Sequence, residues 1–199
     1  MTEASIRVAT IGDLPELYEV ALKTGNSGTD ASGMYVNDVM LGEVFVGPYV
    51  TLAPETSFAL TQGVNVVGYG LCVVDTVEFQ SKSEELWWPK LQQKYQDHKS
   101  AADSDWLLKE IFSPSTSPVS ILESFPSHGH IDLLPSIQGL GWGKKMMQKM
   151  ELVLSHYGSP GFHLRVSANN ERALKFYGSI GYLELLRRDD EVVVGKVLK

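Results

Sequence analysis

The chain has 199 residues, 43% of them hydrophobic, and a formal net charge of −7 at pH 7. This length and apolar content fit one domain, residues 1–199, with a sizeable core. The acidic balance argues against general nucleic-acid binding, which uses a basic face. A single cysteine, Cys72, excludes an internal disulfide and a thiolate metal cluster, and the five histidines lack zinc-type spacing. We therefore expect no metal site and no nucleic-acid partner.

Signals for membrane insertion or export are also missing from the sequence. No segment approaches the roughly 20 apolar residues that span a bilayer. The first residues, Met1 to Ala4, lack the basic start and the apolar run of a signal peptide. We expect a soluble cytoplasmic protein without a membrane partner.

The first predicted elements are a strand over residues 6–9 and a helix over residues 14–24. Asp13 can cap this helix, because a side-chain oxygen there accepts a free backbone N–H. Gly25 ends the helix. Residues 26–33 then form a polar loop with two glycines.

A second, shorter helix is predicted over residues 34–47, and Pro48 and Pro54 bracket a loop or an extended piece. Residues 56–61 and 64–74 indicate a hairpin. Its second arm is long and β-branched, which is typical of a central strand.

Residues 76–127 are rich in aromatic side chains and hold three of the four tryptophans. We expect helices over residues 84–95 and 105–112, while Asp75 closes the preceding strand and is a candidate to face a cleft. This segment could cover a substrate site, form a homodimer contact or hold a satellite core, and the sequence leaves the three alternatives open.

Residues 128–144 combine a strand, a glycine-rich turn and the start of a helix. An apolar run that ends at Pro135 suits a buried strand, because proline lacks the N–H that a strand needs. Lys144 then opens an amphipathic helix that stops near Gly158. Glycines at alternate positions separate the two elements: Gly139, Gly141 and Gly143.

A strand, a glycine loop and a helix N-terminus together make an anion site, for which a phosphate or a pyrophosphate is the natural guest. The glycine spacing matches neither the dinucleotide fingerprint nor the P-loop. A tight turn that binds nothing therefore stays open at this point. Beyond it, the pattern predicts a strand over residues 161–167, a helix over 170–180 and a hairpin with arms at 182–186 and 192–198.

Two motifs carry a resemblance to a known family. The run from Gln138 to Gly143, Gln-Gly-Leu-Gly-Trp-Gly, resembles the Gln/Arg-x-x-Gly-x-Gly/Ala signature of the GNAT acetyltransferase superfamily. The later pattern, with Asn170, Ala173, Phe176-Tyr177 and Gly181-Tyr182, resembles the next strand–helix unit of that family.

Three further segments resemble the C-terminal acetyltransferase-like domain of O-GlcNAcases and its free-standing bacterial relatives: Gly28 to Ser32, Val46 to Tyr49, and His130 to Pro135. This second resemblance does not imply glycosidase activity, which belongs to a separate domain.

The resemblance implies an α/β (α+β) GNAT fold. Its mixed central sheet has about seven strands and is flanked by helices. Strand 4, at residues 131–134, splays from strand 5, at residues 164–167, and the helical insertion at about 76–127 lies between strands 3 and 4.

The implied activity is transfer of acetyl from acetyl-CoA to a primary amine of a small molecule or a peptide, by direct attack on the thioester. Backbone groups of Leu133 and Leu134 are expected to bond the pantetheine arm, and one of their N–H groups to stabilise the oxyanion. Tyr177 matches the family's general acid, although periodicity alone favours a core tyrosine. Asn170 matches a cofactor contact but could also be a plain helix cap. The pyrophosphate is expected to lie on Gln138, Gly139, Leu140, Gly141, Trp142, Gly143 and Lys144.

An amine acceptor must lose a proton, so some base is needed. The candidates are His128, His130, Asp132 and Asp75, and a structural role for Asp132 stays open. Because the segment after the first helix lines the acceptor site in the family, Asp30 is a candidate substrate contact together with Asp75 and His130. The alternative function is a catalytically inactive acetyl-CoA-binding or protein-interaction module.

Overall fold

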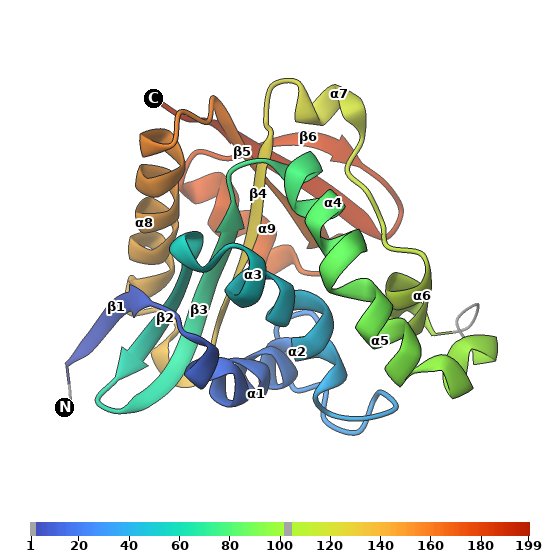
Figure 1. The fold of residues 1–199 in the computed structure, drawn as a ribbon. Coiled ribbons are helices and arrows are strands. Elements are labelled where there is room, and N and C mark those ends of the chain that lie inside the picture. Colours follow the sequence, from blue (N-terminus) through green and yellow to red (C-terminus); the bar gives the residue numbers. More distant parts are fainter. Residues whose placement is uncertain (1–2, 102–104) are drawn as a thin grey trace.

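A computed structural model describes residues 3–101 and 105–199 of the chain (Figure 1). Within them seven strands form one mixed sheet in the order β1-β2-β3-β4-β5-β7-β6. Only β4 and β5 pair in parallel, and the other neighbouring strands are antiparallel. This arrangement confirms the predicted fold class. The strands are β1 Ala4–Val8, β2 Ser57–Gln62, β3 Asn65–Val73, β4 Ser127–Leu133, β5 Gly161–Ser167, β6 Leu183–Arg187 and β7 Glu191–Val197.

Helices cover both faces of the sheet (Figure 1). They are α1 Leu14–Thr24, α2 Met40–Phe45, α3 Gly47–Leu52, α4 Thr76–Leu86, α5 Trp88–Lys94, α6 Trp106–Phe112, α7 Val119–Leu122, α8 Trp142–His156 and α9 Glu171–Ser179. Short 3₁₀ turns lie at Ile11–Asp13, Pro54–Thr56, Gln96–Ala101 and Pro135–Ile137. In the described part of the chain, no helix has the length and apolarity that crossing a bilayer requires.

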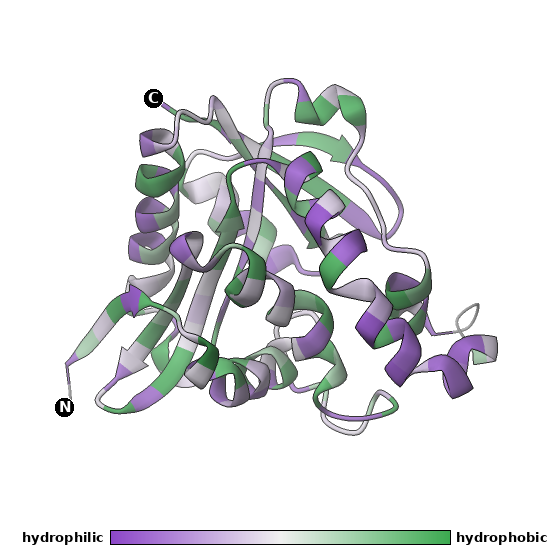
Figure 2. Cartoon of the chain, viewed as in Figure 1, coloured by the Kyte–Doolittle hydropathy of each residue, from purple (hydrophilic) through white to green (hydrophobic). Residues whose placement is uncertain are grey.

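Each face of the sheet has its own apolar core. One core joins α1, α2 and α3 to β3 through side chains such as Leu17, Met40 and Tyr69. The other joins α8 and α9 to the opposite face, and Figure 2 shows the alternation of hydrophobic and hydrophilic turns along α8. The buried side chains of α8 are Met146, Met147, Met150 and Leu154.

The segment over residues 34–54 differs from the prediction. The helix expected over 34–47 begins only at Met40, and a further helix, α3, occupies the stretch where a loop was expected. Pro48 lies in the first turn of α3, where the missing N–H costs no hydrogen bond. Val46, with φ −120°, separates α2 from α3.

The insertion begins where it was predicted, but its first helix starts earlier than the helix expected over residues 84–95. Helix α4 follows β3 directly, and Asp75 caps it by accepting the N–H of Glu78 at 2.9 Å. Six buried apolar side chains of the insertion belong to the same core as α1 and α2, which argues against a satellite core. These side chains are Phe79, Leu91, Tyr95, Leu107, Leu108 and Ile111.

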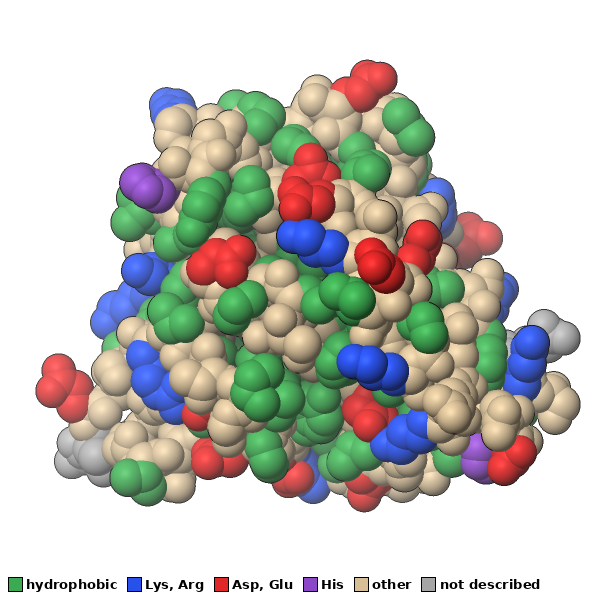
Figure 3. Space-filling model, viewed as in Figure 1, with side chains coloured by type: hydrophobic (Ala, Val, Ile, Leu, Met, Phe, Trp, Pro, Cys, Tyr) green, Lys and Arg blue, Asp and Glu red, His purple; other side chains and the backbone are tan. Residues whose placement is uncertain are grey.

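Contacts with Glu43 tie the insertion to α2. The indole Nε1 of Trp87 donates to the Glu43 carbonyl at 2.9 Å, and Lys94 and Tyr95 each contact the Glu43 carboxylate at 2.6 Å. The insertion therefore fixes the helices that lie over β4. On the face of the molecule drawn in Figure 3, acidic and basic side chains are interspersed.

Candidate active site

The parting of β4 from β5 defines the site. The two strands pair only at Ser127–Phe162 and His128–His163, whereas β5 and β7 pair along seven positions. Beyond His128 the strands diverge, as the resemblance implied.

Hydrogen-bond alternation decides which backbone groups face the splay. The N–H of Leu134 donates to the carbonyl of Val67 at 2.9 Å, so it points to β3 and is not free for a ligand. In an antiparallel pair every second residue bonds to the neighbour, so the backbone groups of Ile131 and Leu133 point the other way, toward β5. Of the two predicted donors, Leu133 is the one that faces the opening.

Gln138 reaches back into the splay. Its Nε2 donates to the Leu133 carbonyl at 2.6 Å, and its Oε1 accepts a hydrogen bond from Arg172 of α9. A Cβ added at Gly28 would lie 3.0 Å from the Arg172 guanidinium, so the loop after α1 closes on the same group. Arg172 was not predicted from the sequence, because its partners lie far from it along the chain.

The glycine turn leaves space at the N-terminus of α8. Gly139 and Gly141 have φ values of 74° and 82°, and a Cβ added to either would meet no atom within 4 Å. Gly141 is the N-cap of α8 and supplies no side-chain acceptor for the first N–H groups. Exposed N–H groups beside open space fit a diphosphate. Gly143 instead lets α8 pack closely against Phe176, because a Cβ there would lie only 3.2 Å from its ring.

The remaining residues of the predicted diphosphate segment take different positions. Leu140 is 63% exposed, and Trp142 is partly buried against the second core. The Lys145 ammonium lies 4.1 Å from the centroid of the Trp142 ring. Lys144 is exposed and lines a different cavity, described below.

Tyr177 lies on α9 with 6% of its surface exposed. Burial raises its pKa, and the Asp132 carboxylate raises it further, so the hydroxyl stays protonated at neutral pH. No residue of the described part hydrogen-bonds this hydroxyl, which leaves it available to a ligand. Asn170 is the N-cap of α9 and accepts the N–H of Ala173 at 3.0 Å, so its predicted role as a helix cap is confirmed.

The acidic and imidazole side chains of β4 share one face of the sheet. Asp132 accepts the Tyr69 hydroxyl at 2.6 Å and lies 3.7 Å from Nδ1 of His130. Both ring nitrogens of His128 are engaged, by Tyr49 and by Thr76, each at 2.8 Å. Burial lowers the pKa of His128 well below its usual value, so this ring is a neutral structural group.

Asp30 and Asp75 lie at different ends of the molecule. Asp30 lines a cavity of about 440 Å³ whose other wall includes Leu134 and Pro135, at the open end of the splay. Its carboxylate bonds Ser32 and pairs with Lys23 at 2.9 Å, and these contacts lower its pKa to about 2. Asp75 instead caps α4 at the end where β4 and β5 are paired, away from the open end of the splay.

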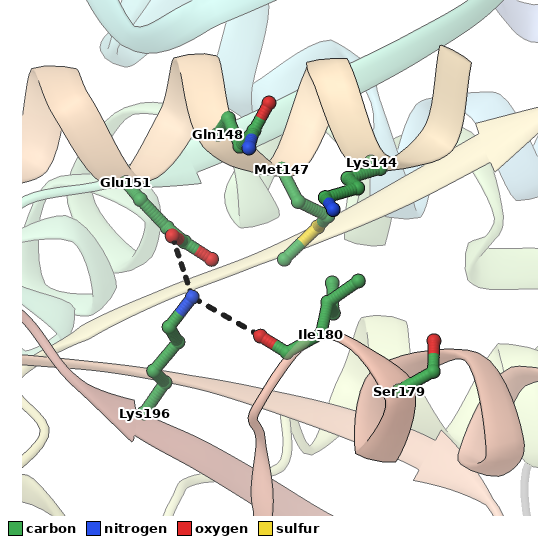
Figure 4. Close-up of a pocket in the computed structure, with 7 residues that line it drawn as sticks. All are labelled: Lys144, Met147, Gln148, Glu151, Ser179, Ile180 and Lys196. Atoms are coloured by element: carbon green, nitrogen blue, oxygen red, sulfur yellow. Dashed lines mark hydrogen bonds and ion pairs between the residues drawn. The ribbon is translucent and has the colours of Figure 1, made fainter. Parts of the chain in front are cut away.

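A second cavity, of about 250 Å³, lies between α8, the end of α9 and β7 (Figure 4). Lys196 bridges the Glu151 carboxylate at 2.8 Å and the Ile180 carbonyl at 3.2 Å across it. The Tyr182 hydroxyl also donates to Glu151 at 3.0 Å. These contacts fix α8 to α9 and β7 outside the splay.

Comparison with known proteins agrees with this geometry. The model of the Acetyltransferase (GNAT) family matches residues 43–182, more than half of the chain. The chain belongs to the GNAT acetyltransferase family. The GNAT match includes the splay, the glycine turn and Tyr177.

Individual relatives give a finer picture. Protein O-GlcNAcase of Rattus norvegicus is 26% identical over an alignment of 167 residues that covers 80% of this chain but only 18% of that protein. The same figures hold for the protein of Mus musculus. This GNAT chain thus spans less than a fifth of the length of these curated relatives.

Solved structures share the fold. The structure of SsHAT superposes with a TM-score of 0.88, at 25% identity, over 98% of both chains. The ribosomal-protein-S18-alanine N-acetyltransferase from Escherichia coli has a TM-score of 0.55 at 14% identity, covering 99% of this chain and 95% of that one, and shows the GNAT fold alone.

Proposed function

We propose that this GNAT protein binds acetyl-CoA and transfers the acetyl group to a primary amine by direct attack on the thioester. The observation that carries the proposal is the splay itself. β4 and β5 stop pairing after His128, and Leu133 presents backbone groups to the opening. An open strand edge inside a sheet leaves polar groups that a ligand with amide groups can satisfy.

The residues divide into those that hold the cofactor and those that act on the reacting atoms. The amides from Gln138 to Lys144 receive the diphosphate, and Leu133 and Asn170 flank the pantetheine arm. When bound, acetyl-CoA supplies an activated acyl group as a thioester. The Leu133 N–H stabilises the oxygen that gains negative charge, which is typically worth about 3 kcal/mol in the transition state. Tyr177 gives its proton to the departing thiolate.

Gln138 must release the Leu133 carbonyl before that carbonyl can bond the arm. The shared contact with Arg172 gives the carboxamide a second partner, toward which it can turn. The loop around Gly28 and Asp30 then lies beside the acceptor mouth. Its cavity at Leu134 lies where the acceptor amine approaches the acetyl group.

Two measurements test this function. Calorimetry with acetyl-CoA tests cofactor binding, and a thiol-release assay over a panel of primary amines tests transfer. Tyr177→Phe is expected to keep acetyl-CoA affinity within about threefold and to lower kcat by about 10²–10³-fold, the usual contribution of a general acid. Binding without amine-dependent thiol release on any amine would instead support a non-catalytic acetyl-CoA-binding module.

A further inference from the structure

Gln138 occupies the splay with its own amide group. Its Nε2 donates to the Leu133 carbonyl at 2.6 Å, and strand register turns that carbonyl toward β5 rather than β3. A side-chain carboxamide and the amides of a pantetheine arm offer the same kind of N–H donor. Without a ligand, Gln138 therefore makes the hydrogen bond that the proposed function assigns to the cofactor arm.

Arg172 holds the carboxamide in this orientation. Its Nη1 donates to Oε1 of Gln138, and a carboxamide whose oxygen is bound on that side presents its NH₂ group to the Leu133 carbonyl. Arg172 is exposed and lies in the first turn of α9. A Cβ added at Gly28 would lie 3.0 Å from Nη2 of Arg172, so the loop after α1 borders the same guanidinium.

The Arg172 guanidinium has no anionic partner. No carboxylate in the described part of the chain forms an ion pair with it, and the adjacent Glu171 pairs with Lys175 at 3.2 Å. The N-terminal end of a helix also disfavours a positive charge. A phosphate accepts two parallel N–H···O bonds from a guanidinium and carries charge, whereas a carboxamide oxygen is neutral. A phosphate at the glycine turn is therefore a stronger partner for Arg172 than Gln138 is.

We propose that the Gln138–Arg172 contact couples the two halves of the cofactor site. A phosphate bound at the glycine turn takes the Arg172 guanidinium. The carboxamide then loses the contact that orients it, and the Leu133 carbonyl becomes free for the pantetheine arm. The contact thus favours thioesters whose pantetheine arm carries a phosphate over those without one. This inference rests on the proposed function, and both residues are positioning residues, because neither touches the reacting atoms.

The first test gives the two halves of the cofactor to the wild-type protein as separate ligands. Two ligands that favour the same conformation strengthen each other's binding by the same factor. NMR titration is expected to show pantetheine binding about fivefold tighter, or more, with saturating inorganic pyrophosphate than without it. If pyrophosphate leaves the Kd of pantetheine unchanged or raises it, or if pantetheine stays unbound in its presence, the inference is wrong.

Gln138→Ala removes the competing amide and leaves Arg172 in place. Without pyrophosphate, this variant is expected to bind pantetheine about fivefold tighter than the wild type, and pyrophosphate should add no further gain. Gln93→Ala, at an exposed glutamine of α5, is the matched control and should keep the wild-type coupling. Coupling of full size in Gln138→Ala would contradict the inference. The wild-type titration needs no variant, so it decides the question even if Gln138→Ala is unstable.

Arg172→Ala tests the other partner. It is expected to weaken pyrophosphate binding about tenfold, because a charge-assisted hydrogen bond is lost, and to abolish the coupling. Calorimetry with coenzyme A separates this inference from the proposed function. If the wild type binds coenzyme A but binds pantetheine and pyrophosphate independently, the inference fails and the proposed function stands. If the wild type does not bind coenzyme A, both fail.

Discussion

Two glycines at the ends of α8 share a backbone conformation but differ in their surroundings. Gly141, before the helix, has φ 82°, and Gly158, after it, has φ 81°. A Cβ at either would meet no atom within 4 Å, so alanine introduces backbone strain without a clash. Only the Cβ at Gly141 would project beside the N–H groups proposed to bind the diphosphate.

This pair separates backbone strain from ligand binding. Gly141→Ala and Gly158→Ala are each expected to cost about 1–2 kcal/mol of stability, the price of a left-handed conformation for an L-residue. Gly141→Ala should also weaken coenzyme A binding at least tenfold, because the methyl group occupies space beside the amides. Calorimetry and thermal unfolding of both variants provide the measurement. Equal affinities would place the diphosphate elsewhere.

At the scale of elements, one carboxylate joins β1 to α1. Asp13 accepts two hydrogen bonds from the Arg7 guanidinium, at 2.6 and 2.7 Å, and one from the Thr10 N–H at 2.7 Å. The Arg7 hydrogen bonds lower the pKa of Asp13, and the Thr10 contacts lower it further. These contacts hold the start of α1 against the edge strand β1. The Asp13 side chain is only 13% exposed, so the pair with Arg7 is partly shielded from water.

The direction of the pKa shift fixes the pH dependence. A carboxyl whose pKa is lowered on folding stabilises the protein above its unfolded pKa, about 3.9, and this contribution is lost as pH falls through the folded value. Asp13→Asn removes the charge that pairs with Arg7 and is expected to cost about 1 kcal/mol at pH 7, a difference that shrinks below pH 4. Urea unfolding at pH 7 and pH 3 measures it, with Asp189→Asn at the β6–β7 turn as the control. If Asp13→Asn lowered the free energy of unfolding by the same amount at pH 7 and pH 3, the charge of Asp13 would not be the cause.

Local signals predicted some elements well and others poorly. Strand β5, the cap at Asn170 and the end of α8 near Gly158 follow from short-range rules, and they lie where the sequence indicated. The start of α4 was missed because Asp75 looked like the end of a strand, although an aspartate is also a helix cap.

The residues of the candidate site divide in the same way, into those that a local motif predicts and those that only the fold reveals. Motif spacing identified the glycine turn and Tyr177. The contacts of Asp132 with Tyr69 and of Gln138 with Arg172 depend on strand register and on the approach of α9, which no short motif encodes. Only the fold could show that Leu133 rather than Leu134 faces the splay.

For the whole molecule, the insertion shares a core with α1, α2, α3 and β3 rather than forming a separate unit. Leu108 of α6 is 1% exposed and belongs to the cluster that includes Met40 of α2 and Tyr69 of β3. Three of the four tryptophans lie in this insertion, so tryptophan fluorescence reports mainly its unfolding: Trp87, Trp88 and Trp106. Far-UV circular dichroism reports the sheet and all helices together.

A shared core predicts that insertion and sheet unfold in one transition. The denaturant midpoints from fluorescence and circular dichroism should coincide in the wild type. Leu108→Ala should lower both midpoints equally. Truncating a buried leucine to alanine costs about 2–5 kcal/mol of the free energy of unfolding. Leu152→Ala, at a 67% exposed position of α8, is the control and should change neither midpoint appreciably. If fluorescence changed at lower denaturant than circular dichroism, the insertion would be unfolding by itself, and α2 and α3 would lose the support that holds Phe45 and Tyr49 around His130.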